Sequence, residues 1–247
     1  MFPYDPVLGA AVRTTPQSIV DVLQTLQMIE ATCIDGDGLK WFNWLYLQVT
    51  QAVETRVASG GFRAPAWLAE LDVQFARLYF GALEGALSRS STPDCWRTVF
   101  DRRNQTSIAR IQFALAGINA HINHDLPEAI VATCEATTTV PKHGSPQYTD
   151  YTSLNTTLDS LIESAKQTLH VRLLGDALPP ASHLEDLVAA WGMGRARETA
   201  WSNAEVLCSD TGWVWHLRQE PPLDSRLMGT LDGLTTLTNK ALLIPVP

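Results

Sequence analysis

The segment Asn119–Pro127 reads Asn-Ala-His-Ile-Asn-His-Asp-Leu-Pro and places two imidazoles and one carboxylate, those of His121, His124 and Asp125, close together. Positions i, i+3 and i+4 share one face of a helix. Neutral imidazole and carboxylate are common ligands of zinc and similar divalent ions. The spacing therefore predicts a metal site, with His121, His124 and Asp125 as the ligands and Zn²⁺ as the ion.

Interpretations without a metal stay open for the same residues. Asp125 could accept hydrogen bonds from the histidines, or cap a short helix that begins at Pro127, and His124 could lie at the surface. The segment also differs from the His-Glu-x-x-His pattern, in which the spacing and the internal glutamate together specify the chemistry. The segment thus predicts a site without fixing its reaction.

Zinc takes three or four protein ligands, so further partners must come from elsewhere in the chain. Asp72 lies in the apolar run Leu71–Phe75, and Glu198 lies in a helical pattern between alanines and tryptophans. An ionisable side chain among core residues is costly unless it is paired or bound to a metal. We therefore predict Asp72 and Glu198 as catalytic partners of the site. Alternatively, Arg195 and Arg197 pair with these carboxylates in a buried network without any metal.

The composition of the 247-residue chain is that of a folded protein with a substantial core. Hydrophobic residues make up 45% and charged residues 18%, and the net charge is −8 without any basic run. This balance argues against nucleic acid as a partner. No apolar run reaches the roughly 18 residues of a transmembrane helix, and the N-terminal residues lack a signal-peptide pattern. We therefore expect a cytoplasmic protein, either a monomer or a homodimer.

Helical periodicity runs through nearly the whole chain and predicts one all-α domain over residues 1–247, a bundle of seven to nine helices. The apolar residues that precede the histidines indicate that their helix is central. The clearest loop covers residues 136–150 and serves either as a lid or pocket wall beside the histidines or as an ordinary linker. In the first half of the chain, helices are expected from Thr15 to about 34, over 39–57, from Pro65 and after Pro93. A further helix is expected over 106–125, followed by a short one that starts at Pro127. The last helices are expected over 154–174, 183–208 and 224–243, and residues 211–217 are ambiguous between helix and strand.

The cysteines and tryptophans do not form a second candidate site as clear as the histidine segment. The four cysteines, Cys33, Cys95, Cys134 and Cys208, contain no Cys-x-x-Cys pair and are predicted to be buried thiols. The eight tryptophans mostly occupy core positions, and some could line a pocket for a flat aromatic ligand. A small aromatic molecule is therefore the predicted partner.

Three segments together resemble a known family. They are Leu71–Phe80, Asn119–Pro127 and Ala196–Trp201, and the middle one carries the pattern Asn-Ala-His-Ile-Asn-x-Asp-Leu-Pro. The chain is similar to a family of helical proteins of unknown function from bacteria and fungi. Within that family it looks like the fungal zinc-dependent cyclopenases of quinolone alkaloid biosynthesis, whose fold is likened to haemocyanin. The resemblance implies that the histidine and aspartate at 121 and 125 recur, whereas the residue at 124 varies.

This resemblance implies a zinc-dependent, ring-contracting lyase of secondary metabolism. Such an enzyme converts a cyclopenin-type benzodiazepinedione epoxide to a viridicatin-type 4-arylquinolin-2-one and releases methyl isocyanate. A zinc ion with an open position would polarise an amide carbonyl, and a nearby carboxylate would move the proton needed for epoxide opening. Two other functions stay open. One is a zinc hydrolase of esters, amides or phosphoesters, and the other is a helical small-molecule binder in which the histidines and Asp125 form a core network.

Overall fold

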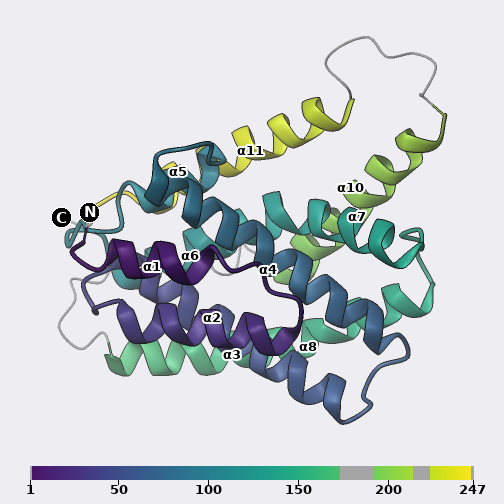
Figure 1. Ribbon diagram of the computed structural model, residues 1–247, viewed down its shortest axis with the longest axis horizontal. Coiled ribbons are helices and arrows are strands. Elements are labelled where there is room, and N and C mark those ends of the chain that lie inside the picture. The colour runs from purple at the N-terminus through teal and green to yellow at the C-terminus, as the bar shows by residue number, and fades with distance from the viewer. Residues whose placement is uncertain (1, 173–191, 214–222, 246–247) are drawn as a thin grey trace.

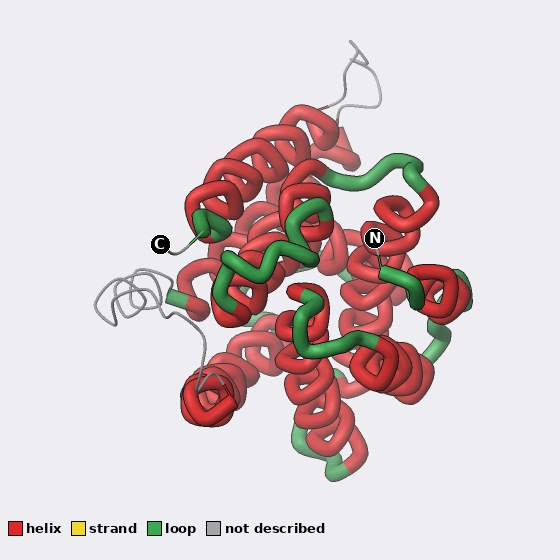
Figure 2. The backbone as a smooth tube through the Cα atoms, turned by 90° about the vertical axis from the view of Figure 1, so that its left-hand side faces the viewer, coloured by secondary structure: helices red, strands yellow, loops and turns green. Residues whose placement is uncertain are grey.

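The computed structural model describes residues 2–172, 192–213 and 223–245, and in these ranges the chain is helical without any strand (Figures 1 and 2). The predicted all-α fold is therefore confirmed. None of the helices in these ranges is both long and apolar enough to cross a membrane. The elements are α1 (Asp5–Val12), α2 (Ile19–Thr32), α3 (Gly38–Ala58), α4 (Pro65–Ser88), α5 (Asp94–Phe100), α6 (Arg110–Ala120), the π-helix η1 (His121–Asp125), α7 (Leu126–Thr137), α8 (Pro146–Arg172), α10 (Met193–Trp213) and α11 (Leu223–Leu242).

The segment that carries the histidines runs through the middle of the bundle (Figure 1). Helix α6 packs against α3 and α11, while α7, which continues from it through η1, packs against α4 and α10. Every residue from Ile111 to Ala120 is buried. A helix that is apolar nearly all round is one that other helices cover on every side. The central position expected from the apolar pattern is therefore confirmed.

The backbone changes its hydrogen bonding at the histidines. In η1 the N–H of Leu126 donates to the carbonyl of His121, five residues back. Pro127 follows at the start of α7; a proline has no N–H, and its ring clashes with the carbonyl four residues earlier in a regular α-helix. The wider π turn relieves this clash, so the helix passes through Pro127 instead of stopping before it. Such π turns inside α-helices are frequent at functional sites.

Two glycines let α3 approach the central helix closely. A Cβ atom on Gly117 would lie 2.4 Å from Phe42, and one on Gly38 would lie 2.5 Å from Phe113. Because these positions lack a side chain, Phe42 can reach the ring of His121, with the ring centroids 5.5 Å apart. The close helix packing therefore places an aromatic wall beside the imidazole.

The expected long loop is shorter than the pattern predicts. Helix α7 continues to Thr137 and α8 begins at Pro146, so residues 138–145 lack helix, not the predicted 136–150. Proline at the first helical position is a usual start signal, and it marks this boundary as it marks the start of α4. The loop boundaries were therefore wrong at both ends, and a role as a lid stays a prediction.

The first helices also differ from expectation. Helix α1 is absent from the prediction, because eight residues are too few to establish a clear apolar period. Helix α2 begins at Ile19, where the side chain of Ser18 caps it, and not at Thr15. The parts of the predicted elements at 183–191 and 214–217 lie outside the described residues.

A buried ion cluster joins three segments that are distant in sequence. Arg103 donates hydrogen bonds to Asp5 in α1 (2.8 Å) and to Asp37 before α3 (2.7 Å), and the three side chains are 9% exposed or less. Asp37 also caps α3 by accepting a hydrogen bond from the N–H of Leu39 (3.0 Å), and it accepts another from the hydroxyl of Tyr4 (3.0 Å). The start of α3 and the segment between α5 and α6 are thus held against α1 through one guanidinium.

Replacing Arg103 with methionine should destabilise the fold by about 3–5 kcal/mol, because two buried carboxylates lose their cation. Urea unfolding at neutral pH, followed by circular dichroism, measures the change. The control is Arg13→Met, which removes an exposed ion pair with Glu84 and should cost less than about 1 kcal/mol. A loss in Arg103→Met no larger than in this control would contradict the role given to the cluster.

Candidate active site

The carboxylate of Asp125 lies at the centre of the site and is 1% exposed. Its Oδ2 accepts hydrogen bonds from Nδ1 of His121 (2.9 Å) and from the indole Nε1 of Trp96 (2.9 Å). Its Oδ1 accepts one from Nδ1 of His124 (2.8 Å). Because an ionised carboxylate only accepts hydrogen bonds, both histidines carry a hydrogen on Nδ1. Their Nε2 atoms are the ring nitrogens left for other partners.

Burial and hydrogen bonding shift the pKa values of Asp125 and His121 in opposite directions. Burial raises the pKa of Asp125, but the hydrogen bonds from the two histidines, together with the charge that these rings carry when protonated, outweigh burial, so this pKa lies below its usual value. Burial lowers the pKa of His121, and the contact with Asp125 does not restore it. At neutral pH His121 is therefore an uncharged imidazole with its hydrogen on Nδ1 and a lone pair on Nε2.

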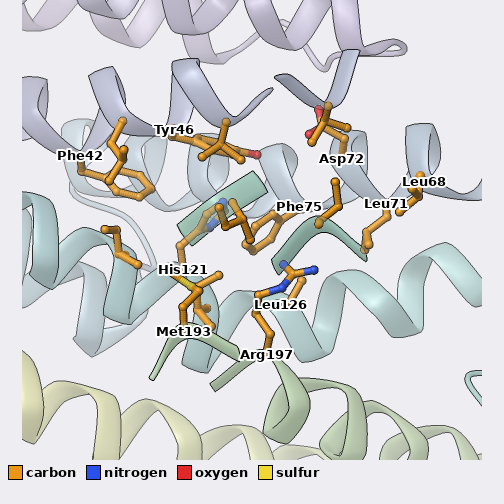
Figure 3. A pocket seen from close by; sticks show the side chains of 17 residues that line it. Phe42, Tyr46, Leu68, Leu71, Asp72, Phe75, His121, Leu126, Met193 and Arg197 are labelled. Atoms are coloured by element: carbon orange, nitrogen blue, oxygen red, sulfur yellow. The ribbon is translucent and has the colours of Figure 1, made fainter. Parts of the chain in front are cut away.

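His121 lines a cavity of about 90 Å³ (Figure 3). Its ring stacks on Phe75, with the ring centroids 3.4 Å apart, and meets the ring of Tyr46 edge-on. The Nε2 atom is buried and has no hydrogen-bond partner within the described ranges. The walls of the cavity are mainly apolar and include Leu45, Leu71, Ile118, Leu126 and Leu158.

Asp72, Tyr46 and Arg197 bring further polar groups to the same cavity (Figure 3). Oδ2 of Asp72 and the hydroxyl of Tyr46 are buried without a hydrogen-bond partner among the described side chains and backbone. Burial raises the pKa of Asp72 to about 7, so this carboxyl can hold a proton close to neutral pH. Arg197 donates to the carbonyl of Tyr151 (2.9 Å) and to Oδ1 of Asn155 (2.8 Å). These acceptors are uncharged, so they do not neutralise the guanidinium.

Glu198 belongs to a different and more exposed cluster. It accepts hydrogen bonds from the hydroxyl of Tyr148 (2.9 Å) and from Nε2 of His143 (2.7 Å), and its side chain is 44% exposed. It is not among the residues that line the cavity. The structure therefore brings Asp72 into the same cavity as His121 but leaves Glu198 outside it. The two predicted catalytic carboxylates do not share one site.

The three predicted metal ligands are neighbours, but they do not converge on one point. Both oxygens of Asp125 face N–H donors, as described above. Within the described ranges, the one group of three metal-ligating side chains whose ligand atoms all lie within 4.8 Å of one another is Cys95, His124 and Asp232. His121 and Asp125 are not members of that group. Zinc binding by His121, His124 and Asp125 together stays a prediction.

Sequence reasoning misses Trp96 as a member of the site. Its side chain is fully buried, as expected of a core tryptophan, yet its indole N–H is committed to Asp125. A buried tryptophan needs an acceptor for its N–H, and this requirement is the only available signal. The sequence gives no indication of which residue supplies that acceptor, because the two positions lie on separate helices.

Comparison with known proteins identifies the family but not an activity. Residues 19–244 match the sequence model of a family of unknown function (DUF5995), and the chain belongs to this family. No curated protein and no solved structure matches the chain. The family match covers the three segments that carry the resemblance described above, but nothing in the comparisons links the chain to cyclopenase.

Replacing Asp72 with asparagine should stabilise the protein at high pH. In the unfolded chain this carboxyl ionises near pH 4, whereas in the folded protein it keeps its proton up to about pH 7. The folded state therefore binds more protons between these values, and wild-type stability falls as the pH rises through this window. The shift corresponds to a cost on the order of 4 kcal/mol above pH 7, which the uncharged asparagine avoids.

Urea unfolding at pH 4 and at pH 8 tests this expectation. The Asp72→Asn variant should match the wild type at pH 4 and exceed it at pH 8. The exposed Asp101 provides the matched control, and Asp101→Asn should show no such gain at pH 8. Equal stability of Asp72→Asn and wild type at both pH values would mean that the carboxyl is hydrated or paired in solution.

Proposed function

We propose that the protein is an enzyme that transfers protons to and from a small, largely apolar substrate bound in the cavity beside His121 and Asp72. The observation that carries this proposal is the state of His121. Its imidazole is neutral, a buried carboxylate holds it at Nδ1, its ring lines an apolar cavity, and its buried Nε2 has no hydrogen-bond partner among the described residues. An imidazole that is oriented in this way acts as a general base, and its carboxylate stabilises the imidazolium that forms.

Asp72 provides the complementary acid. Enzymes separate acid from base by giving the two groups different environments. Burial keeps His121 unprotonated at neutral pH and keeps a proton on a large fraction of Asp72. The two side chains line the same cavity, so a bound substrate can meet both of them. His121 accepts a proton from the substrate, and Asp72 delivers one to the oxygen that receives electron density.

The remaining lining residues indicate the class of substrate. Phe42, Tyr46 and Phe75 form aromatic walls, which suit a planar ring. Arg197 contributes a buried cation at the cavity wall, and a guanidinium binds carbonyl and carboxylate oxygens through its N–H donors. The proposed substrate is therefore a small aromatic molecule that carries a carbonyl or carboxylate group.

The described residues of the cavity wall do not include a group of three zinc ligands. Among the described residues, His121 and Asp72 are the ligand-type side chains that line the cavity. Zinc takes at least three protein ligands. Within the described part of the chain, no third ligand completes a group with these two. The proton transfers are therefore assigned to the side chains themselves.

Ring contraction of a cyclopenin-type epoxide is the specific reaction that the sequence resemblance suggests. It requires a proton at the epoxide oxygen when the ring opens and removal of a proton when the quinolone becomes aromatic. Asp72 and His121 would perform these two tasks, and the substrate carries both aryl rings and amide carbonyls. The assignment of this reaction rests on the three shared sequence segments and on its match to the acid and base of the cavity.

A turnover assay with cyclopenin tests the proposal, alongside a panel of aryl esters, amides and phosphoesters. His121→Gln should reduce kcat by about 10²- to 10⁴-fold, the usual contribution of a general base. His143→Gln is the matched control, because His143 is also held by carboxylates but lies in the exposed cluster with Glu198. This control should leave kcat unchanged.

The other outcomes separate the alternatives. Turnover of esters or phosphoesters without turnover of cyclopenin would identify a hydrolase that uses the same base. Saturable binding of aromatic ligands without turnover of any substrate would identify a binding protein and overturn the enzyme proposal. Unchanged turnover in a folded His121→Gln variant would remove His121 from the mechanism.

A further inference from the structure

The second carboxylate oxygen of Asp125, Oδ1, is connected through His124 to another group of reactive side chains. Oδ1 holds His124, and His124 lies with Cys95 and Asp232 in the compact group described above. These three residues come from three elements: Cys95 from α5, His124 from η1 and Asp232 from α11. Their convergence is therefore produced by tertiary packing and not by local spacing. The proton-transfer chemistry proposed for the cavity uses none of the three.

The group is well ordered by its own hydrogen bonds. Oδ1 of Asp232 accepts from the backbone N–H of Cys95 (2.8 Å), and Oδ2 accepts from the backbone N–H of Asp94 (3.0 Å). A carboxylate has about four lone-pair positions, so each oxygen can still bind a second partner. His124 and Cys95 are buried, whereas Asp232 is partly exposed and leaves a route for a small ion.

Carboxylates dominate the electrostatic environment of the group among the described residues. Burial lowers the pKa of His124, but the hydrogen bond to Asp125 and the charges of Asp125, Asp232 and Glu128 outweigh burial and raise this pKa above its usual value. Asp125 and Asp232 also act on Cys95. Burial raises the pKa of the Cys95 thiol, and the two carboxylates raise it further, so the thiol is neutral. A bound divalent cation would offset the carboxylate charge and would convert the thiol to a thiolate ligand.

We propose that Cys95, His124 and Asp232 bind a zinc ion. The ligands are Sγ of Cys95, Nε2 of His124 and a carboxylate oxygen of Asp232. Thiolate and imidazole select zinc over magnesium and calcium, which prefer oxygen ligands. Three protein ligands leave a fourth tetrahedral position for water. The thiol proton passes to the solvent when the ion binds.

Asp125 would support the proposed zinc site by holding the ring of its ligand His124. A histidine that binds a metal usually donates its other ring N–H to a carboxylate, which fixes the ring and makes the coordinating nitrogen more basic. The hydrogen bond from Nδ1 of His124 to Asp125 meets this requirement and leaves Nε2 for the ion. The site also joins α5, η1 and α11, so zinc should stabilise the fold by binding the native state selectively.

Cobalt substitution provides a test that does not depend on enzymatic activity. Chelator-treated full-length protein is titrated with Co²⁺, which reports a thiolate ligand through a sulfur-to-cobalt charge-transfer band in the near ultraviolet. We expect about one equivalent of Co²⁺, displaced by Zn²⁺. Cys95→Ser should abolish the band, whereas Cys134→Ser, which alters another buried thiol, should retain it. Absence of the band in the wild type overturns the proposal.

Two further variants locate the ion relative to the cavity. Asp125→Asn should weaken Co²⁺ binding about 10- to 100-fold, the usual effect of removing a supporting carboxylate. His121→Gln should leave the band and the stoichiometry unchanged, because His121 is not a ligand. Loss of Co²⁺ in His121→Gln together with its retention in Cys95→Ser would place the metal in the cavity and overturn the proposal.

Folding of the variants is controlled by circular dichroism. If Cys95→Ser does not fold, Asp232→Asn replaces it, because Asp232 is partly exposed, and this variant should lose most of the Co²⁺ affinity. Retained affinity in folded Asp232→Asn counts against the site. Failure of metal binding leaves the proton-transfer proposal intact, because that proposal depends on His121 and Asp72.

Discussion

The buried charge of Asp125 is the constraint on which the site depends. A carboxylate with almost no contact with water is stable only when protein groups replace the lost hydration. Here three N–H donors do so, from His121, His124 and Trp96. The same hydrogen bonds fix the tautomer and orientation of both imidazoles. One charge thus fixes the orientation of two imidazoles, of which His121 lines the cavity and His124 belongs to the group with Cys95.

The remaining polar residues of the segment position this charge and take no part in its chemistry. Asn119 donates to Oδ1 of Asn239 (2.8 Å), and Asn239 donates to the carbonyl of Cys95 (3.0 Å). These buried amides join the central helix to α11 and α5. Asn123 donates a hydrogen bond to Oδ1 of Asn119 (2.8 Å) and is the last member of this amide network. Because an unsatisfied buried amide is costly, the network restricts how α5 and α11 can pack, and so it also determines where Cys95 and Asp232 lie.

The sequence pattern predicts those features that depend on local periodicity. It predicts the all-helical fold, the central helix and the proximity of His121 to Asp125, because each follows from apolar spacing or from positions on one helix face. It does not predict Trp96 or Asp232 as members of the site, since their contacts cross between helices. The prediction that His121 and His124 bind one ion assumed a regular α-helix, whereas both residues lie in the π turn that precedes Pro127. Glu198 illustrates a further limit, because an apolar neighbourhood in sequence does not separate a cavity wall from an exposed cluster.

The two oxygens of Asp125 share one negative charge, so a change at His124 affects His121. A cation at His124 would strengthen the hydrogen bond from His124 to Oδ1 and withdraw charge from the carboxylate. Less charge would then remain at Oδ2 to stabilise a positive His121. By thermodynamic linkage, any effect of the ion on His121 is matched by an equal effect of His121 on the ion. Asp125 therefore couples the group of Cys95, His124 and Asp232 electrostatically to the cavity, and Trp96 donates a third hydrogen bond that holds Oδ2.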